Sequence, residues 1–431
     1  MFSRIIAALT FVFVCPVLVV ATETTQTAGG VVSPHRVATL HRVPAAIASK
    51  TQTPGVSDDV ALARWVAQFR QRALAAGISA TSFDAAMGDV RYLKKVIERD
   101  RNQFEFSKTI WDYLDIAVSP KRVLNGKASL RKWRTTLLKI ESRYRVDKEI
   151  IAAIWGLESA YGTKRGKIPV LSALATLSYD GRRGAFFETQ LIAALKIFQN
   201  DQISATKMTG SWAGAMGHTQ FMPSSFQEYA VDFTGDGKRD IWSDNPTDAL
   251  ASTAAYLAKF GWVKGMPWGV EVHLPDDFNY AKAQRKIRKM PLVWAQSGVV
   301  GVSGKPIPEY GKASVLLPAG ANGAAFLVFQ NFAALEAYNS SDAYVIAVGH
   351  LADRISGGGK IKAKWPLEDR ALRFEERQDL QRLLTAKGFN TKGVDGLIGP
   401  LTIAAVRGFQ RSVGLPADGY ASLRILQRLR R

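Results

Sequence analysis

One glutamate combines an acidic side chain with a position on the apolar face of an expected helix. The segment DKEIIAAIWGLESAYG runs from Asp147, which suits a helix start, to Gly162, which suits a helix end. Glu158 follows Ile154 by four residues, so both side chains lie on one helical stripe. Burial disfavours the charged form of a carboxyl group and raises its pKa. The pattern therefore indicates a general acid that can donate a proton near neutral pH.

The same spacing allows a second interpretation, in which Glu158 has no catalytic role. The carboxylate then lies at the edge of the apolar stripe, where it reaches solvent or pairs with Lys164 or Arg165. Helical periodicity alone does not separate these two interpretations.

Residues 232–243, DFTGDGKRDIWS, have the spacing of a calcium-binding loop. Oxygen-bearing groups occupy loop positions 1, 3, 5, 7 and 9, and Gly237 stands at position 6, where a sharp turn is required. Ser243 replaces the usual glutamate at position 12, and Asp244 or Asp248 can substitute for it. The alternative is an Asp- and Gly-rich turn without metal. The candidate ligands within the loop are Asp232, Thr234, Asp236, Lys238 through its carbonyl, and Asp240.

A mostly helical protein must position these residues. Helical periodicity is found over residues 58–161, 187–199, 247–260 and 332–356. Residues 269–330 differ from these segments, because apolar positions alternate there between glycines and prolines, which predicts a small β-rich subdomain. The expected fold class is therefore mainly α (α+β).

The carboxyl-terminal part is predicted to form a separate domain. Glycines and lysines mark a linker at 357–370, and three short helices are expected over 371–431. The long segment before it, residues 58–356, is then one catalytic or binding domain.

The amino terminus resembles an export signal. Residues 1–21 hold one basic residue and then an apolar run that is shorter than the roughly 20 residues of a spanning helix. Residues 22–57 are rich in Thr, Ala, Val and Pro, which indicates a flexible linker. We expect a periplasmic protein with no transmembrane segment after signal removal. Cys15 lacks the preceding small residues that favour lipoprotein anchoring.

Composition and charge exclude several classes of protein. The 431 residues are 47% hydrophobic, carry a net charge of +20 and include one cysteine. Wholesale disorder, a disulfide scaffold and a cysteine zinc site are therefore excluded. The charge predicts an anionic partner. Because the protein is expected to be exported, its anionic partner is expected to be a polymer of the cell wall rather than nucleic acid.

Four separated motifs resemble the lytic transglycosylase B family, which cleaves peptidoglycan. They are GLESAYG at 156–162, GSWAGAMGHTQFMPSSF at 210–226, VDFTGDGKRDIW at 231–242 and EAYNSSDAYVIAV at 336–348. The resemblance implies a lysozyme-like core with helical and small β-rich additions. It also implies that Glu158 protonates the glycosidic oxygen after N-acetylmuramic acid and then acts as base on that sugar's C6 hydroxyl, closing a 1,6-anhydro ring.

The resemblance also implies substrate-binding residues and requires no cofactor for the chemistry. Asp248 becomes the preferred last ligand of a structural calcium ion. For Ser211 the alternative is a helix cap, for Arg182 and Arg183 a solvated turn, and for Met216, Phe221 and Tyr256 core packing. The implied groove residues are Ser211, Gln220, Arg182, Arg183, Tyr256, Tyr338, Asn339, Met216 and Phe221.

The segment VDGLIGPLTIAAVRGFQRSVGLPADG at 394–419 resembles the three-helix peptidoglycan-binding domain. A periplasmic, monomeric lytic transglycosylase acting on peptidoglycan strands is therefore predicted. A hydrolytic muramidase remains an alternative, with Asp180 or Glu188 as its second carboxylate. A non-catalytic wall-binding protein is the other alternative, and a nucleic-acid binder has the charge alone in its favour.

Overall fold

The computed structural model describes residues 57–101, 108–201 and 203–431. The predicted signal peptide and nearly all of the predicted amino-terminal linker lie outside these residues. Within the described part, no helix is both long enough and apolar enough to cross a membrane.

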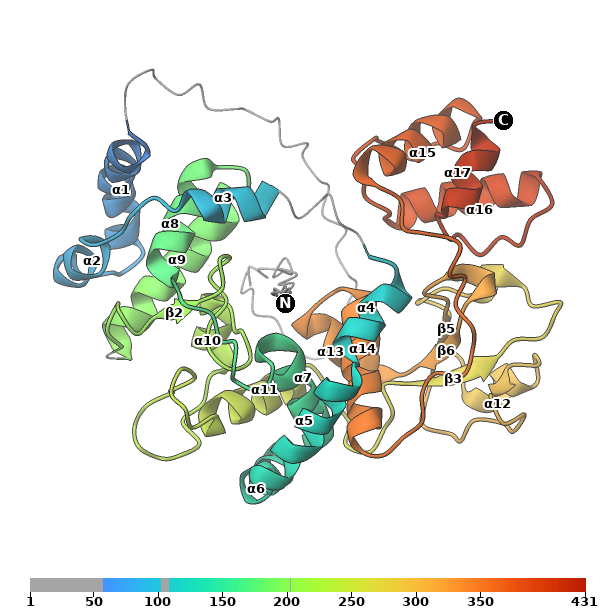
Figure 1. Cartoon of the computed structure of the whole chain (residues 1–431), viewed down its shortest axis with the longest axis horizontal. Coiled ribbons are helices and arrows are strands. Elements are labelled where there is room, and N and C mark those ends of the chain that lie inside the picture. The colour runs from blue at the N-terminus through green and yellow to red at the C-terminus, as the bar shows by residue number, and fades with distance from the viewer. Residues whose placement is uncertain (1–56, 102–107, 202) are drawn as a thin grey trace, which may run out of the picture.

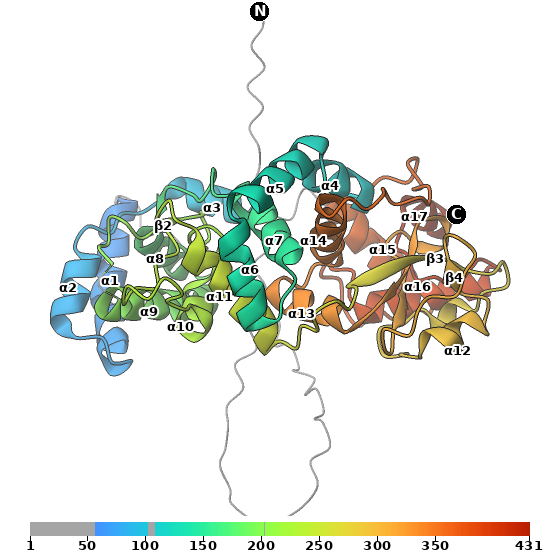
Figure 2. The same ribbon diagram turned by 90° about the horizontal axis from the view of Figure 1, so that it is seen from below.

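Most of the chain forms a helical core around α7 (Lys148–Ser159). Helix α7 packs against α5, α11 and α14 near the middle of the molecule (Figures 1 and 2). It is apolar on almost all sides, which is the pattern of a fully buried helix. The other core helices are α1 (Asp58–Ala75), α2 (Ala80–Met87), α3 (Lys94–Arg101), α4 (Ile110–Ala117), α5 (Pro120–Lys132), α6 (Arg134–Tyr144), α8 (Val170–Asp180), α9 (Gly184–Asn200), α10 (Pro223–Tyr229), α11 (Thr247–Lys259), α13 (Gln330–Tyr338) and α14 (Asp342–Ile355).

The end of α7 is an unusual turn. Helix α7 begins after Asp147, as predicted, but it ends at Ser159, three residues before Gly162. Ala160, Tyr161 and Gly162 all have positive φ, at 49°, 58° and 84°. This conformation costs energy for residues other than glycine. The hydroxyl of Tyr161 donates to the Arg122 carbonyl (2.9 Å), which helps to hold the turn.

The β-rich subdomain expected at 269–330 is an antiparallel sheet with strand order β4-β3-β6-β5. Its own apolar cluster is centred on Trp294, whose indole N–H donates to the Ala313 carbonyl (2.9 Å). The elements of this subdomain are β3 (Gly269–His273), η2 (Tyr280–Lys282), α12 (Pro291–Ala295), β4 (Val300–Gly301), β5 (Ser314–Leu316), η3 (Gly320–Asn322) and β6 (Ala325–Val328). A separate two-stranded pair, β1 (Ile168–Pro169) and β2 (Thr209–Gly210), lies in the helical part.

Three helices form the carboxyl-terminal unit, α15 (Phe374–Ala386), α16 (Pro400–Ser412) and α17 (Leu423–Leu429). They enclose a small core of their own around Leu380, Val406 and Leu426. Figure 1 shows this unit beside the four-stranded sheet. The predominance of helices, with small sheets, confirms the expected fold class.

The segment between the core and the carboxyl-terminal unit follows the protein surface. The Glu271 carboxylate accepts hydrogen bonds from the backbone N–H groups of Lys362 and Ala363 (2.9 and 2.7 Å). The Trp365 ring lies 6.2 Å from the Trp111 ring. These contacts fix the path of the chain between the two units.

Among the described residues, two hydrogen bonds join the carboxyl-terminal unit directly to the core. The Asp418 carboxylate accepts a hydrogen bond from the Ala321 N–H (2.8 Å), and the Arg407 guanidinium donates to the Ala283 carbonyl (2.8 Å). Both core residues belong to the β-rich subdomain.

Candidate active site

Glu158 lies in the last turn of α7 and is 8% exposed. Its Oε1 accepts a hydrogen bond from the Tyr344 hydroxyl (2.6 Å), which comes from α14. Burial raises the pKa of Glu158 to about 7, although the Tyr344 hydrogen bond opposes this rise. A carboxyl group with this pKa is substantially protonated at neutral pH, so it can donate a proton and later accept one.

Three tyrosines surround this carboxyl group. Burial raises the pKa of Tyr113, Tyr338 and Tyr344, and the charge of Glu158 adds to each rise. Their phenols therefore remain protonated at neutral pH. They come from α4, α13 and α14, so three separate helices bring their hydroxyl groups to the surroundings of Glu158.

The two candidates for a second catalytic carboxylate are engaged elsewhere. Asp180 pairs with Arg101 (2.8 Å), and Glu188 pairs with Arg72 (2.7 Å). Among the described residues, no carboxylate contributes to the pKa shift of Glu158. Asp180 and Glu188 are therefore not available to act as the second carboxylate beside Glu158.

The Gly-rich segment 210–226 folds back on itself beside α7. Met216 and Phe221 exchange both backbone hydrogen bonds (2.8 and 3.0 Å). Their side chains are 0% and 2% exposed, which favours the core-packing interpretation over contact with sugar. The Ser211 hydroxyl accepts from the backbone N–H groups of Ala213 and Ala215 (3.3 and 3.1 Å). Ser211 thus stabilises a turn within the Gly-rich segment and does not cap a helix, because the next helix begins only at Pro223.

Gln220 has a φ of 55°, an uncommon value for a residue other than glycine. Its side-chain amide donates to the carbonyls of Arg165 and Gly217 (3.0 and 2.8 Å). The bond to Arg165 ties the Gly-rich segment to the loop that follows α7, and the bond to Gly217 lies within the segment.

His218 makes a further connection that sequence reasoning missed. Its Nδ1 accepts from the Trp155 indole N–H (3.1 Å), so Nε2 carries the hydrogen and donates to the Ser243 carbonyl (2.7 Å). Its own carbonyl accepts from the Ser159 hydroxyl (2.5 Å). Burial lowers the pKa of His218 and favours this neutral ring. The histidine therefore links the helix of Glu158 to two separate loops.

Tyr256, Tyr338 and Asn339 gather at the end of α13. The Tyr338 hydroxyl donates to the Thr219 carbonyl, and the Tyr256 hydroxyl to the Ala337 carbonyl, both at 2.6 Å. The two rings lie 5.1 Å apart, edge to face. The Asn339 side-chain oxygen accepts from the Ser341 N–H (3.1 Å). These residues connect the Gly-rich segment to the start of α14, which carries Tyr344.

The arginine pair is bound within the protein. The Arg182 guanidinium forms a two-pronged ion pair with Asp100, which is 1% exposed. Arg183 lies over the rings of Phe186 and Phe187, at 4.7 and 5.1 Å from their centres. Both arginines therefore have intramolecular partners, unlike those of a solvated turn.

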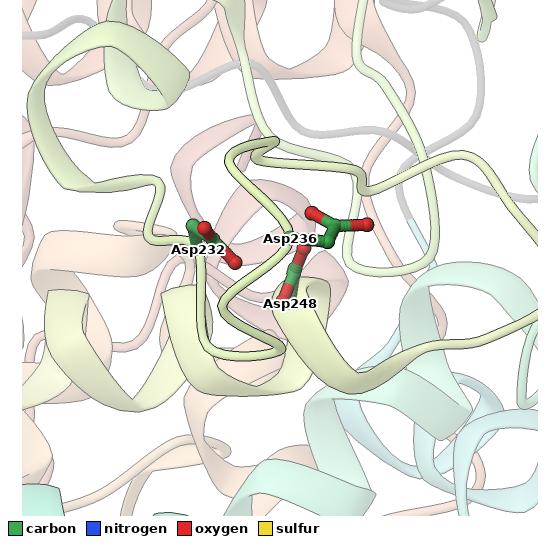
Figure 3. Close-up of side chains that lie close together, drawn as sticks. All are labelled: Asp232, Asp236 and Asp248. Atoms are coloured by element: carbon green, nitrogen blue, oxygen red, sulfur yellow. The ribbon is translucent and has the colours of Figure 1, made fainter.

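The loop at 232–243 brings three carboxylates together (Figure 3). Ligand atoms of Asp232, Asp236 and Asp248 lie within 4.8 Å of one another. Asp248 is 2% exposed, and burial raises its pKa even though backbone N–H groups oppose the rise. A hard cation such as Ca²⁺ prefers oxygen ligands of this kind and would offset their mutual repulsion. The donor set therefore fits calcium.

The other candidate ligands differ in their surroundings. Asp240 Oδ1 accepts from the N–H groups of Trp242 and Ser243 (2.9 and 3.0 Å), which caps the end of the loop. Asp244 pairs with Arg165 (2.7 Å), which leaves Asp248 as the third carboxylate of the cluster. Thr234 and Lys238 are exposed at the tip.

Comparison with known proteins agrees with this geometry. Residues 61–353 match the transglycosylase SLT domain family, and residues 374–429 match a peptidoglycan binding domain family. The first match covers well over half of the chain. The chain therefore belongs to the transglycosylase SLT domain family, the class of lytic transglycosylases, as the four motifs predicted.

Particular relatives refine this assignment. The chain is similar to the crystal structure of SltB3 from Pseudomonas aeruginosa in complex with NAG-anhNAM-pentapeptide, with a TM-score of 0.84 and 50% identity over 86% of this chain and 99% of that chain. It is also similar to Escherichia coli Slt35 in complex with calcium, with a TM-score of 0.58 and 29% identity over 69% and 93% of the two chains. Membrane-bound lytic murein transglycosylase B of Escherichia coli K12 is 35% identical over 246 residues, which span 56% of this chain and 65% of that protein.

Proposed function

We propose that this protein is a lytic transglycosylase that cleaves the β-1,4 bond between N-acetylmuramic acid and N-acetylglucosamine in peptidoglycan. The observation that carries the proposal is one buried carboxyl group, Glu158, with a pKa of about 7 and no cooperating carboxylate among the described residues. Family membership supports the substrate. The anhydro-sugar ligand of SltB3 supports the same product here.

The proposed reaction uses Glu158 twice. Protonated Glu158 first gives its proton to the glycosidic oxygen, and the bond from that oxygen to C1 of the muramic residue breaks. The carboxylate then takes the proton of the C6 hydroxyl on the same residue, and O6 bonds to C1 to close the 1,6-anhydro ring. The acid is regenerated and no water is consumed. An internal nucleophile also has a high effective concentration.

The tyrosine hydroxyls support both steps. The Tyr344 hydrogen bond orients the carboxyl group and stabilises its ionised form between the two proton transfers. The neutral phenols of Tyr113 and Tyr338 provide polar groups without a competing negative charge. Asn339 is proposed to bind an N-acetyl group of the glycan, and Gln220, Ser211 and Tyr256 to line the groove.

Export to the periplasm, capture of the wall by the carboxyl-terminal domain and a structural calcium ion complete the proposal. The three-carboxylate cluster and the calcium complex of Slt35 support the calcium ion. Its role would be to stabilise the loop, since the Gly-rich segment rather than the calcium loop contacts the residues beside Glu158.

Mass spectrometry of muropeptides tests the proposal. The full chain without its predicted signal is incubated with purified sacculi in H₂¹⁸O, beside the Glu158→Gln variant. We expect anhydro-muramic ends that contain no ¹⁸O, and their loss in the variant. Reducing ends labelled with ¹⁸O would instead establish a hydrolase. Sacculi that are bound but left intact by the unaltered chain would identify a wall-binding protein.

A further inference from the structure

A lysine-rich pocket includes Gly162, from the turn that follows α7, in its wall. It is a depression of about 770 Å³, within the usual size range of ligand sites. Its wall is formed by the loop 162–167, the segment around Lys207 and Thr209, and the calcium loop from Lys238 to Ser243. These three segments come from well-separated parts of the sequence.

The positive charge of this pocket is only partly neutralised by the protein. Its aspartates are engaged, because Asp201 pairs with Arg239 (2.7 Å) and Asp240 caps the loop end. Arg165 pairs with Asp244 outside the pocket lining. Four lining lysines are exposed and have no ion pair to a described residue, namely Lys164, Lys167, Lys207 and Lys238.

The pocket is held in shape before any ligand arrives. Gly166 has a φ of 88°, and a Cβ there would lie 2.1 Å from the Gly210 carbonyl oxygen, so the loop and β2 are in close contact. The Trp242 indole N–H donates to the Thr209 carbonyl (3.1 Å), which fixes an aromatic side chain in the wall. A preformed cationic pocket loses little entropy when it binds an anion.

The location of the pocket favours one anion. Gly162 lines it and follows Glu158 by four residues, so their Cα atoms are at most about 14 Å apart. A stem peptide of five residues, attached to the muramic sugar whose bond is cut, extends about 17 Å. Such a peptide carries several free carboxylates. Arg182 and Arg183, which the family resemblance implied as groove residues, have partners within the protein.

We propose that this pocket binds the carboxylates of the peptidoglycan stem peptide through Lys164, Lys167, Lys207 and Lys238. The inference rests on the proposed function for the identity of the polymer. It makes the protein selective for peptide-bearing strands over naked glycan. The lysines act as exposed point charges, so their contribution falls as salt concentration rises.

Binding of a muramyl pentapeptide to the full chain carrying Glu158→Gln, measured by calorimetry, tests the pocket without any cleavage. The pocket variant adds Lys164→Gln, Lys167→Gln and Lys207→Gln. The control variant adds Lys95→Gln, Lys139→Gln and Lys387→Gln, which are also exposed and remove the same charge. A second peptide with amidated carboxylates and inorganic phosphate serve as comparison ligands.

We expect the pocket variant to weaken binding of the acidic peptide by about tenfold and the control variant to change it by less than about twofold. The amidated peptide should bind equally to both. In the active background, the pocket variant should cut naked glycan at the normal rate and peptide-bearing strands with a raised KM. An equal loss in both variants, or phosphate displacing the peptide at equal concentration, would overturn the assignment. Failure of the proposed function would appear separately, as absence of anhydro products.

Discussion

Replacing Tyr344 with phenylalanine removes the hydroxyl that donates to Glu158 and keeps the ring in place. This hydrogen bond favours the ionised carboxylate and opposes the rise in pKa that burial causes. A hydrogen bond to a charged group contributes about 1.5–3 kcal/mol, and one pKa unit corresponds to about 1.4 kcal/mol. The variant should therefore raise the pKa of Glu158 from about 7 by roughly 1 to 2 units.

The shift has a definite sign in the pH profile. The first proton transfer needs the protonated acid, so the rate falls as pH rises through the pKa of Glu158. We expect this alkaline limb to move from near pH 7 toward pH 8 to 9 in Tyr344→Phe. The assay is release of anhydro-muropeptides from sacculi between pH 5 and 10.

Tyr338→Phe is the matched control, because the Tyr338 hydroxyl donates to the Thr219 carbonyl and not to Glu158. Its alkaline limb should stay near that of the unaltered chain, whatever happens to the maximal rate. An unmoved limb in Tyr344→Phe, or a limb at lower pH, would refute the role of Glu158 as the titrating acid or the role of Tyr344 in setting its pKa.

Three further outcomes are expected. Arg182→Ala should lower the free energy of unfolding by about 3 kcal/mol in urea denaturation because it leaves the buried Asp100 charge unpaired, whereas Arg101→Ala, in an exposed pair, should cost less than about 1 kcal/mol. Asp248→Asn should abolish the rise in Tm that added calcium causes, and a retained rise would exclude this cluster as the site. Because the folded pKa of Glu158 exceeds its ordinary value of 4.5, the ionised side chain destabilises the fold progressively from about pH 4.5 to 7; Glu158→Gln should therefore stabilise the protein by about 3 kcal/mol at pH 8 and by much less at pH 4, as scanning calorimetry would measure.

Local sequence signals predicted much of the architecture. Asp147 marks the start of α7, because the chain there changes from polar to continuously apolar. Its end was predicted less well. Gly162 is the residue that best tolerates a positive φ, yet the helix has already ended at Ser159, because Ala160 and Tyr161 adopt the same left-handed conformation. Tertiary contacts, such as that of Tyr161 with α5, select this conformation, and no local propensity reports them.

Side-chain contacts between residues far apart in the chain could not be predicted from the sequence. Tyr344 lies in the motif EAYNSSDAYVIAV, but it is 186 residues from Glu158, and a tyrosine on an apolar helix usually indicates packing. Arg182 was predicted beside the substrate, and its two-pronged bond to Asp100 depends on a contact across 82 residues. Spacing therefore led to Glu158 as the candidate acid, whereas the groups that set its pKa and the partner of Arg182 required the folded chain.

The path of the chain between the core and the carboxyl-terminal unit determines how far that unit lies from Glu158. A flexible linker would let the unit sample a range of distances from Glu158, and the length of such a linker could be changed freely. Here Glu271 holds residues 362 and 363, and Asp418 holds the far end of the unit. The segment thus acts as a rigid spacer. A glycan strand bound by both the carboxyl-terminal unit and the core would reach Glu158 at one fixed distance from that unit. Residues inserted into the segment would change this distance rather than only lengthen a flexible linker.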